Sequence, residues 1–104
     1  MRDPDLGPIL RRTRRRVILR VLARLEPQTA SELTLEQALD ASRVAFSDRE
    51  AVRTELTWLE AQGFVEVEDV AGMLYATILD AGVAIANGKR NHPDIEKSPS
   101  KRTS

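Results

Sequence analysis

Arginine side chains at helical spacing are the residues of this chain best suited to a chemical task, and that task is anion binding. Arg49 and Arg53 lie four positions apart in a stretch with helical periodicity. On a helix placed in the major groove of DNA, either guanidinium could donate two hydrogen bonds to guanine. Ser47, Thr54 and Thr57 lie nearby and complete a predicted DNA-binding set, in which base edges and phosphates are both contacted.

A second and denser group of arginines lies near the N-terminus. Its members are Arg11, Arg12, Arg14, Arg15, Arg16, Arg20 and Arg24. Like charges four residues apart cost an isolated helix roughly 0.2 to 0.5 kcal/mol per pair, so such a helix is expected to meet an anion. That anion is either nucleic-acid phosphate or the acidic middle of the chain itself, residues 26–80, in the same subunit or in a sister subunit. For DNA, the predicted contacts are Arg11, Arg12, Arg15 and Arg16.

The charges of the chain are segregated although they sum to zero. Residues 1–25 hold eight arginines against two acids, giving +6. Residues 26–80 hold three arginines against twelve acids, giving −9, and residues 81–104 hold five basic residues against two acids, giving +3. Two basic ends therefore flank an acidic middle, and this asymmetry bears on the choice of partner.

Composition argues against several classes of protein. The chain has no cysteine, and its one histidine, His92, lies in a polar stretch, so neither a metal site nor a cofactor is expected. No glycine-rich phosphate loop, nucleophile elbow or paired carboxylates stand out, so we expect a protein that is not an enzyme. No apolar run approaches the roughly 20 residues of a membrane span, and a cytoplasmic protein is expected.

Periodicity and turn residues place the arginines on discrete elements of one domain, residues 8–88. A flexible arm is expected over residues 1–7 and a disordered basic tail over 89–104. The predicted helices cover residues 8–25, about 31–41 with Thr29 or Ser31 as cap, a stretch from Ser47 to Gly63, and about 81–86 with Asp80 as cap. Two strands are predicted at residues 64–68 and 73–78, joined by a turn.

The third predicted helix has the clearest end signals. Ser47 followed by Glu50 predicts a capping box, Phe46 is expected to pack against Ala51, and Gly63 suits the position after the helix. The residues expected to form its buried stripe are Val52, Leu56 and Leu59.

The order of three helices, a two-stranded wing and a C-terminal helix predicts a mainly α fold with a small β-hairpin, the winged helix-turn-helix. The stretches VLARLEPQTASE, SDREAVRTELTWLEAQGFVEVEDV and ATILDAGVAIANG resemble a family of small winged-helix proteins of Mu-like phages and prophages, within the broad ArsR-like type. The resemblance covers about residues 8 to 90. It implies a role in transcription regulation or in the late region of a phage, without the cysteine-based metal sites of ArsR-like sensors.

The predicted wing and the aromatic residues point away from a simple DNA contact. Glu66, Glu68 and Asp69 carry negative charge into the wing, where no lysine or arginine balances it, so the wing is expected to pack or to contact protein. Trp58 and Tyr75 are expected mainly to pack in the core.

Two functional hypotheses follow from these features. The first is a phage transcriptional regulator that binds double-stranded DNA, and the second is a winged-helix module that binds a phage protein during DNA packaging or assembly. A homodimer is expected because a small chain would leave apolar surface uncovered. The residues expected at the dimer interface are Leu10, Val17, Val21 and Ile85.

Overall fold

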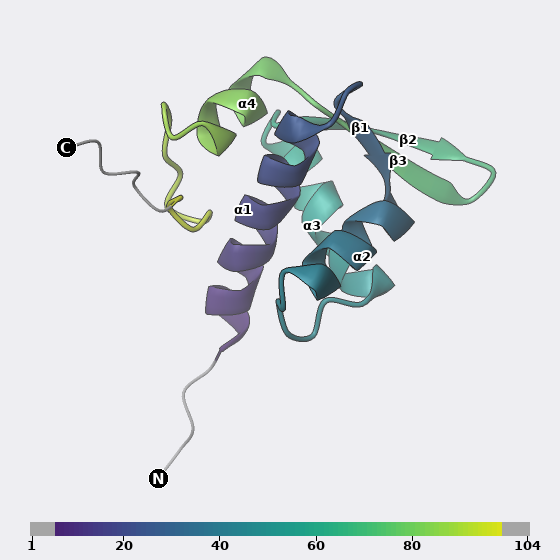
Figure 1. The fold of residues 1–104 in the computed structure, drawn as a ribbon, viewed down its shortest axis with the longest axis horizontal. Coiled ribbons are helices and arrows are strands. Elements are labelled where there is room, and N and C mark those ends of the chain that lie inside the picture. The colour runs from purple at the N-terminus through teal and green to yellow at the C-terminus, as the bar shows by residue number, and fades with distance from the viewer. Residues whose placement is uncertain (1–5, 99–104) are drawn as a thin grey trace, which may run out of the picture.

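The structure is a computed structural model that describes residues 6–98 (Figure 1). Its elements are α1 (Gly7–Arg24), β1 (Thr29–Ser31), α2 (Glu32–Ala41), α3 (Arg49–Ala61), β2 (Val65–Val70), β3 (Met73–Ile78) and α4 (Asp80–Ala86). The predicted combination of helices with a small sheet is confirmed, and β1 is a further strand that was not predicted. Gly7 of the predicted arm belongs to α1, whereas residues 1–5 lie outside the described residues.

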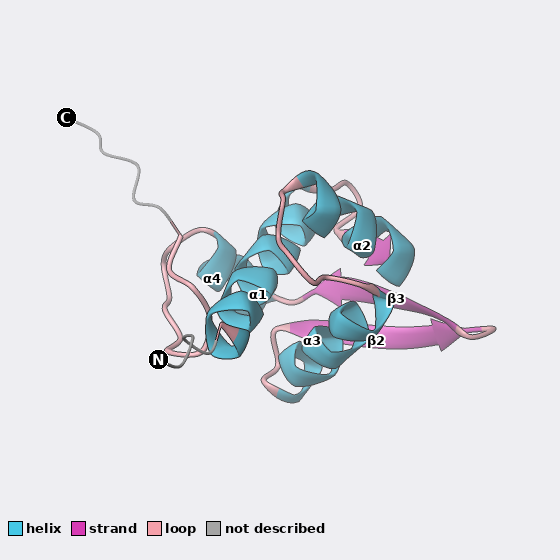
Figure 2. Ribbon diagram, turned by 90° about the horizontal axis from the view of Figure 1, so that it is seen from below, coloured by secondary structure: helices cyan, strands magenta, loops and turns pink. Residues whose placement is uncertain are grey.

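The three strands form one antiparallel sheet in the order β1-β3-β2. The pairing of β2 with β3 ends with Val70 opposite Met73, so only two residues connect these strands. Both connecting residues, Ala71 and Gly72, have positive φ angles of 53° and 88°, as a type I′ turn requires. Figure 2 shows that the resulting hairpin extends away from α1 and α4.

Short polar side chains cap α2 and α3, but only one of the two caps is the predicted one. Ser31 caps α2, because its Oγ accepts a hydrogen bond from a first-turn amide at 3.1 Å. Asp48 caps α3, with its Oδ1 accepting from the amide of Ala51 at 2.9 Å. The predicted capping box of Ser47 and Glu50 is therefore wrong, since the carboxylate of the next residue takes the first-turn amide.

The turn between α2 and α3 has an unusual backbone. Arg43 and Phe46 have φ angles of 60° and 56°, a region that bulky residues rarely occupy. The Phe46 side chain is 78% exposed, so the predicted packing of Phe46 on Ala51 is wrong. The Phe46 carbonyl oxygen accepts a hydrogen bond from Arg14 Nη2 at 2.7 Å, which fixes the turn to α1.

The end of α3 follows the prediction. Gly63 has a φ angle of 81° and donates from its amide to the Glu60 carbonyl at 3.0 Å. The Phe64 amide donates to the Leu59 carbonyl at 3.0 Å, which completes a Schellman motif. The motif turns the chain from α3 into β2 and buries the Phe64 ring.

The hydrophobic core is contributed by all four helices and the inner face of the sheet. Its largest apolar members are Phe64, Ile18, Leu19, Leu22, Leu35, Leu39, Leu56 and Leu59. Val17 and Ile85 also lie in this core, so their predicted place at a dimer interface is wrong. Val21 is half-buried and packs against the core, and its place at an interface stays a prediction. Leu10 is half-buried, and the homodimer itself stays a prediction.

The C-terminal segment, residues 89–98, lies along α1 instead of being disordered as predicted (Figure 1). Ile95 is only 2% exposed, and the amide of Glu96 donates to the Arg12 carbonyl at 3.1 Å. One apolar side chain and a set of polar contacts are thus enough to order a segment of polar composition. Residues 99–104 of the predicted tail lie outside the described residues.

Helix α4 packs closely on the beginning of β2. A Cβ atom at Gly82 would lie 2.3 Å from the carbonyl oxygen of Phe64, so no side chain fits there. The cap residue is Leu79, whose amide donates to the same carbonyl, and the side chain of Asp80 makes no capping bond. The prediction of Asp80 as the cap is therefore wrong.

Candidate nucleic-acid interface

The two arginines predicted to read DNA bases both form ion pairs with α2. Arg49 Nε donates to Glu36 Oε1 at 2.9 Å. Arg53 donates from Nε and Nη2 to the two oxygens of Glu32, at 2.6 and 2.8 Å. These contacts join α3 to α2, and both guanidinium groups are already engaged with a carboxylate.

Glu32 is the centre of the second of these contacts. Its side chain is fully buried and also accepts a hydrogen bond from the Leu74 amide at 2.9 Å. The hydrogen bonds from Arg53 lower the pKa of the Glu32 carboxyl to about 2. Arg53 donates further to the Gly72 carbonyl at 2.9 Å, so this cluster ties the hairpin to α2 and α3.

The predicted hydroxyl contacts are engaged within the chain as well. Thr54 and Thr57 donate from Oγ1 to the carbonyls of Glu50 and Arg53, at 3.0 and 2.9 Å. Ser47 donates to the Ala45 carbonyl at 3.3 Å. Both threonine side chains lie on the exposed face of α3, but their protons point back to their own helix.

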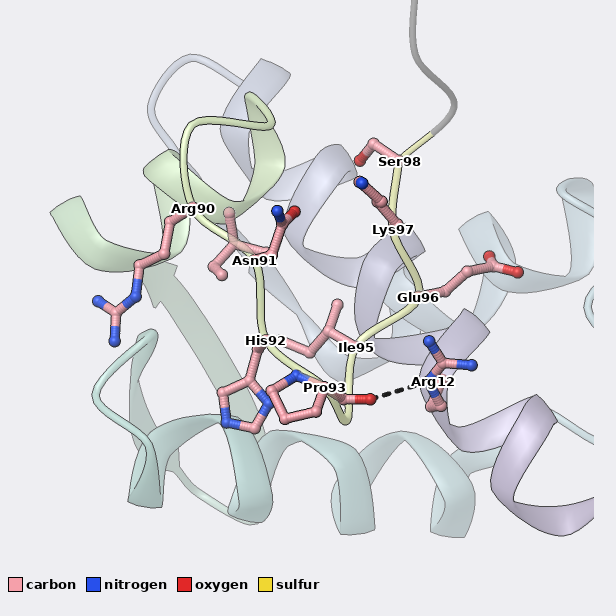
Figure 3. A pocket seen from close by; sticks show the side chains of 10 residues that line it. Arg12, Arg90, Asn91, His92, Pro93, Ile95, Glu96, Lys97 and Ser98 are labelled. Atoms are coloured by element: carbon pink, nitrogen blue, oxygen red, sulfur yellow. Dashed lines mark hydrogen bonds between the residues drawn. The ribbon is translucent and has the colours of Figure 1, made fainter.

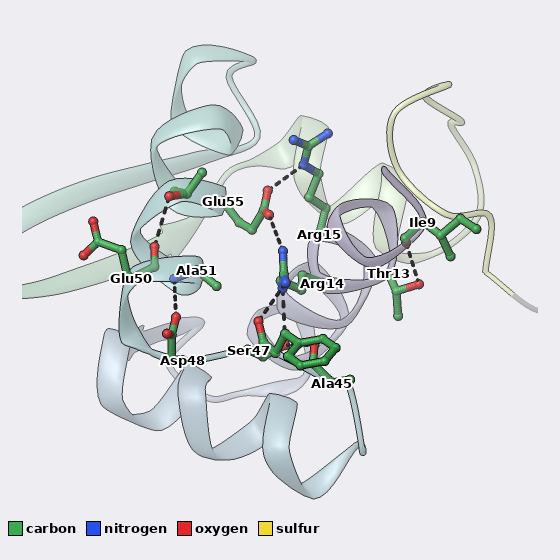
Figure 4. A network of polar contacts seen from close by, with 12 residues as sticks. Ile9, Thr13, Arg14, Arg15, Ala45, Ser47, Asp48, Glu50, Ala51 and Glu55 are labelled. Carbon is green, nitrogen blue, oxygen red and sulfur yellow. Dashed lines mark hydrogen bonds and ion pairs between the residues drawn. The ribbon is translucent and has the colours of Figure 1, made fainter. Parts of the chain in front are cut away.

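On α1 the arginines converge on a buried glutamate of α3 (Figure 4). Glu55 accepts from Arg15 Nε at 2.7 Å and from Arg14 Nη1 at 3.2 Å, and its side chain is 1% exposed. Arg15 also donates to the Asp94 carbonyl at 3.0 Å, and its guanidinium lies 3.8 Å from the ring centre of Trp58. Arg14 Nε donates to Ser47 Oγ at 3.3 Å.

Two more of the predicted phosphate contacts bind the C-terminal segment. Arg12 Nε donates to the Pro93 carbonyl at 3.1 Å, as Figure 3 shows. Arg16 Nε pairs with Glu96 Oε1 at 2.6 Å. Arg11 is exposed and makes no ion pair or side-chain hydrogen bond with any described residue. Of the four predicted contacts on α1, Arg11 is therefore the one that is not engaged by any residue between 6 and 98.

The carboxylates of the chain thus meet its own arginines, one of the two alternatives that the sequence left open. Arg14 and Arg15 meet Glu55 of the acidic middle, whereas the partner of Arg16 lies in the C-terminal segment. The sequence carried a signal for Glu55, because it falls on the same helical stripe as the buried Val52. A glutamate on a buried stripe indicates a buried ion pair.

The aromatic residues and the histidine have different surroundings. Trp58 packs against the core, as predicted, and its ring also lies against the Arg15 guanidinium and the His92 ring. His92 lies in a polar stretch of the sequence, but its ring packs edge-on against Trp58 and Phe64, with ring centres 5.2 and 5.8 Å apart. Tyr75 is 40% exposed, and its predicted core position is wrong.

Within residues 6–98 there is no group of three or more histidine, aspartate or glutamate side chains that could hold a metal ion. No helix in the same part of the chain is long and apolar enough to cross a membrane.

Comparisons with known proteins place the chain in a phage family. No family model matches it, and no solved structure matches it. It is 36% identical over 92 residues to the uncharacterized protein gp26 of Escherichia phage Mu, and the alignment covers 88% of this chain and 94% of gp26. Identity at this level along nearly the whole of both chains shows that this protein belongs to the family of phage Mu gp26.

Proposed function

We propose that this protein is a winged-helix module that binds another protein through an acidic surface. The winged-helix part of the proposal is supported by the order of the elements. A short β1 between α1 and α2 pairs with β3, and a tight hairpin follows α3. In this arrangement α3 is the equivalent of a recognition helix and the β2–β3 hairpin is the wing.

The observation that carries the proposal is the engagement of Arg49 and Arg53 by α2. With these two cations paired, the part of the chain that would face DNA retains a large excess of negative charge. Residues 48–70 hold seven acids and two arginines, and six of these acids remain when Glu55, which is buried against Arg14 and Arg15, is set aside. Glu50 on α3 and Glu66 and Glu68 on β2 are exposed. This surface repels phosphate and attracts a basic protein.

Releasing Arg53 for a DNA base would be costly. Glu32 would remain as a buried carboxylate without its cation, and the removal of one partner from a buried ion pair is strongly destabilising. The Gly72 carbonyl at the hairpin turn would also lose its donor. Arg53 is therefore a structural residue of this module, and the same reasoning applies less strongly to the exposed pair of Arg49 and Glu36.

The test compares the two partners directly. The full-length protein is applied to an array of overlapping short peptides that covers the proteins encoded by phage Mu. Its binding to a random DNA duplex is measured by fluorescence anisotropy at low and near-physiological salt. We expect retention of a defined set of basic peptides and no duplex binding at near-physiological salt. Sequence-specific duplex binding that survives this salt, with no peptide retained, would overturn the proposal.

A second candidate function, binding of DNA as a phage regulator, is favoured by one observation. Arg11, Arg20 and Arg24 of α1 form no ion pair or side-chain hydrogen bond with another described residue, so three cations stay available for phosphates. Three phosphate contacts give an expected log-log salt slope of about −2.7. In the anisotropy experiment a slope near this value, removed by replacing the three arginines with glutamine, would support duplex binding through α1.

A further inference from the structure

We infer that the docking surface of this module is the outer face of its sheet, and that its partner is a basic segment of another protein that carries an apolar side chain. This inference rests on the proposed function and adds to it the place of contact and the chemistry of the partner.

The register of the strands defines this outer face. Val65, Ala76 and Ile78 point to the core and are buried, so the residues that alternate with them point outward. The outward residues, called here the outer sheet face, are Glu66, Glu68, Val70, Met73, Tyr75 and Thr77. Val70 and Tyr75 are 47% and 40% exposed, which leaves an apolar centre open to solvent. Tyrosine and methionine are both enriched in protein interfaces.

The charge of the outer sheet face defines the partner. None of the three strands contains a lysine or an arginine. Glu66 and Glu68 are exposed, and neither carboxylate forms an ion pair with any residue between 6 and 98. Glu68 lies directly opposite Tyr75, so a carboxylate stands beside the aromatic ring. A side chain of arginine or lysine, next to an apolar residue, complements this pair of groups.

The hairpin that carries the face is fixed from behind. Glu32 accepts from the Leu74 amide and Arg53 donates to the Gly72 carbonyl, so the turn end of the hairpin is held to α2 and α3. Glu60 Oε2 accepts from the Val67 amide at 3.0 Å. A surface that is already rigid loses little conformational entropy when a partner binds.

The same contacts argue against two other occupants. The amide of Val67 points away from β3, and the bond to Glu60 leaves it unavailable for an added strand at the β2 edge. A second copy of the chain, stacked sheet against sheet, would bring Glu66 and Glu68 close to their own equivalents. Like charges across an interface disfavour this arrangement.

The experiment uses the basic peptide that the wild-type protein binds most tightly on the phage Mu array. Its affinity is measured by fluorescence anisotropy for the double variant Glu66→Lys with Glu68→Lys, and for Tyr75→Ala. The matched control is Glu26→Lys with Asp40→Lys, which changes the net charge equally at exposed acids outside the sheet and outside the proposed acidic surface. Thermal unfolding by circular dichroism confirms that each variant is folded.

We expect the sheet double variant to weaken binding about tenfold or more, and Tyr75→Ala to weaken it about 30-fold, as for a hot spot of about 2 kcal/mol. The control should change the affinity by less than about threefold. If the control variant loses affinity and the sheet variants do not, the partner does not dock on the outer sheet face. The proposed function, binding of a basic protein, would still stand. If the array retains no basic peptide, both the inference and the proposed function fail.

Discussion

Two buried glutamates, Glu32 and Glu55, hold two different parts of the molecule, and they do so with different partners. Glu55 is covered by two arginines of α1, both about one-tenth exposed. Glu32 is bound by one arginine, Arg53, which is 41% exposed, and by a backbone amide of β3. The first cluster joins α1 to α3 beneath the C-terminal segment, and the second joins the hairpin to α2.

The difference shows that exposure alone does not make an arginine available to a ligand. The exposed fraction of the Arg53 side chain alone would suggest that it is free to bind a ligand. Its hydrogen bonds are instead directed to Glu32 and to the Gly72 carbonyl. Arg15 is both buried and engaged. In both clusters the cation serves the fold, so a charge count along the sequence overstates the capacity of this protein to bind phosphate.

The largest expected effect comes from removing the carboxylate that is paired with two largely buried arginines. Glu55→Ala leaves the guanidinium groups of Arg14 and Arg15 without their anion, and we expect a loss of about 3–5 kcal/mol in the free energy of unfolding. Urea unfolding measures this loss. Glu50→Ala, at an exposed position of the same helix, is the control and should change stability by less than about 0.5 kcal/mol. Equal losses of stability in the two variants would contradict the expected contribution of the Glu55 ion pairs to the free energy of unfolding.

The next effect concerns the segment that covers the Glu55 cluster. Ile95 is 2% exposed, so Ile95→Ala should remove about 2 kcal/mol or more of stability by creating a cavity. The exposed neighbour Lys97, changed to alanine, provides the control. If Ile95→Ala unfolds at the same urea concentration as the wild type, the segment does not contribute to the core in solution.

The contribution of Glu32 to the stability of the protein is expected to depend on pH. Its carboxyl has a folded pKa of about 2, below the unfolded value of 4.5, so its contribution to stability is complete above about pH 4.5 and is lost as the pH falls toward 2. The variant Glu32→Gln lacks this titration. Wild type and variant are unfolded in urea at several pH values between 6 and 2, and the advantage of the wild type should shrink across that window. An advantage independent of pH would show that Glu32 is not held as a carboxylate.

The smallest effect is expected at Arg49. Its pair with Glu36 is partly exposed on both sides, 41% and 31%, so Arg49→Ala should cost no more than about 1 kcal/mol. A larger loss in the free energy of unfolding by urea would show that Arg49, like Arg53, is needed to hold α3 against α2. A normal stability would make this variant a clean probe of any residual contact between α3 and DNA.

The helices of this protein were predictable because their signals are local. The buried stripe of Val52, Leu56 and Leu59 and the glycine after α3 follow from the helical period and from chain geometry. The three-residue β1 was not predictable, because the strand with which it pairs, β3, follows more than forty residues later.

The candidate site was less predictable because its residues depend on distant partners. Helical spacing identified the arginines of α1, but the partners of Arg12 and Arg16 lie in a segment whose composition indicated disorder. One isoleucine within that segment, Ile95, was too weak a pattern to predict packing. Charge periodicity therefore located the cations and could not assign their anions.

The distance along the chain between α1 and its C-terminal partners has a consequence for the time course of folding. Arg12 and the Pro93 carbonyl are separated by 81 residues, and Arg16 and Glu96 by 80. At a synthesis rate of about 5–20 residues per second, the ribosome needs about 4–16 s to add this length of chain. Throughout that interval the nascent α1 carries guanidinium groups whose final acceptors do not yet exist.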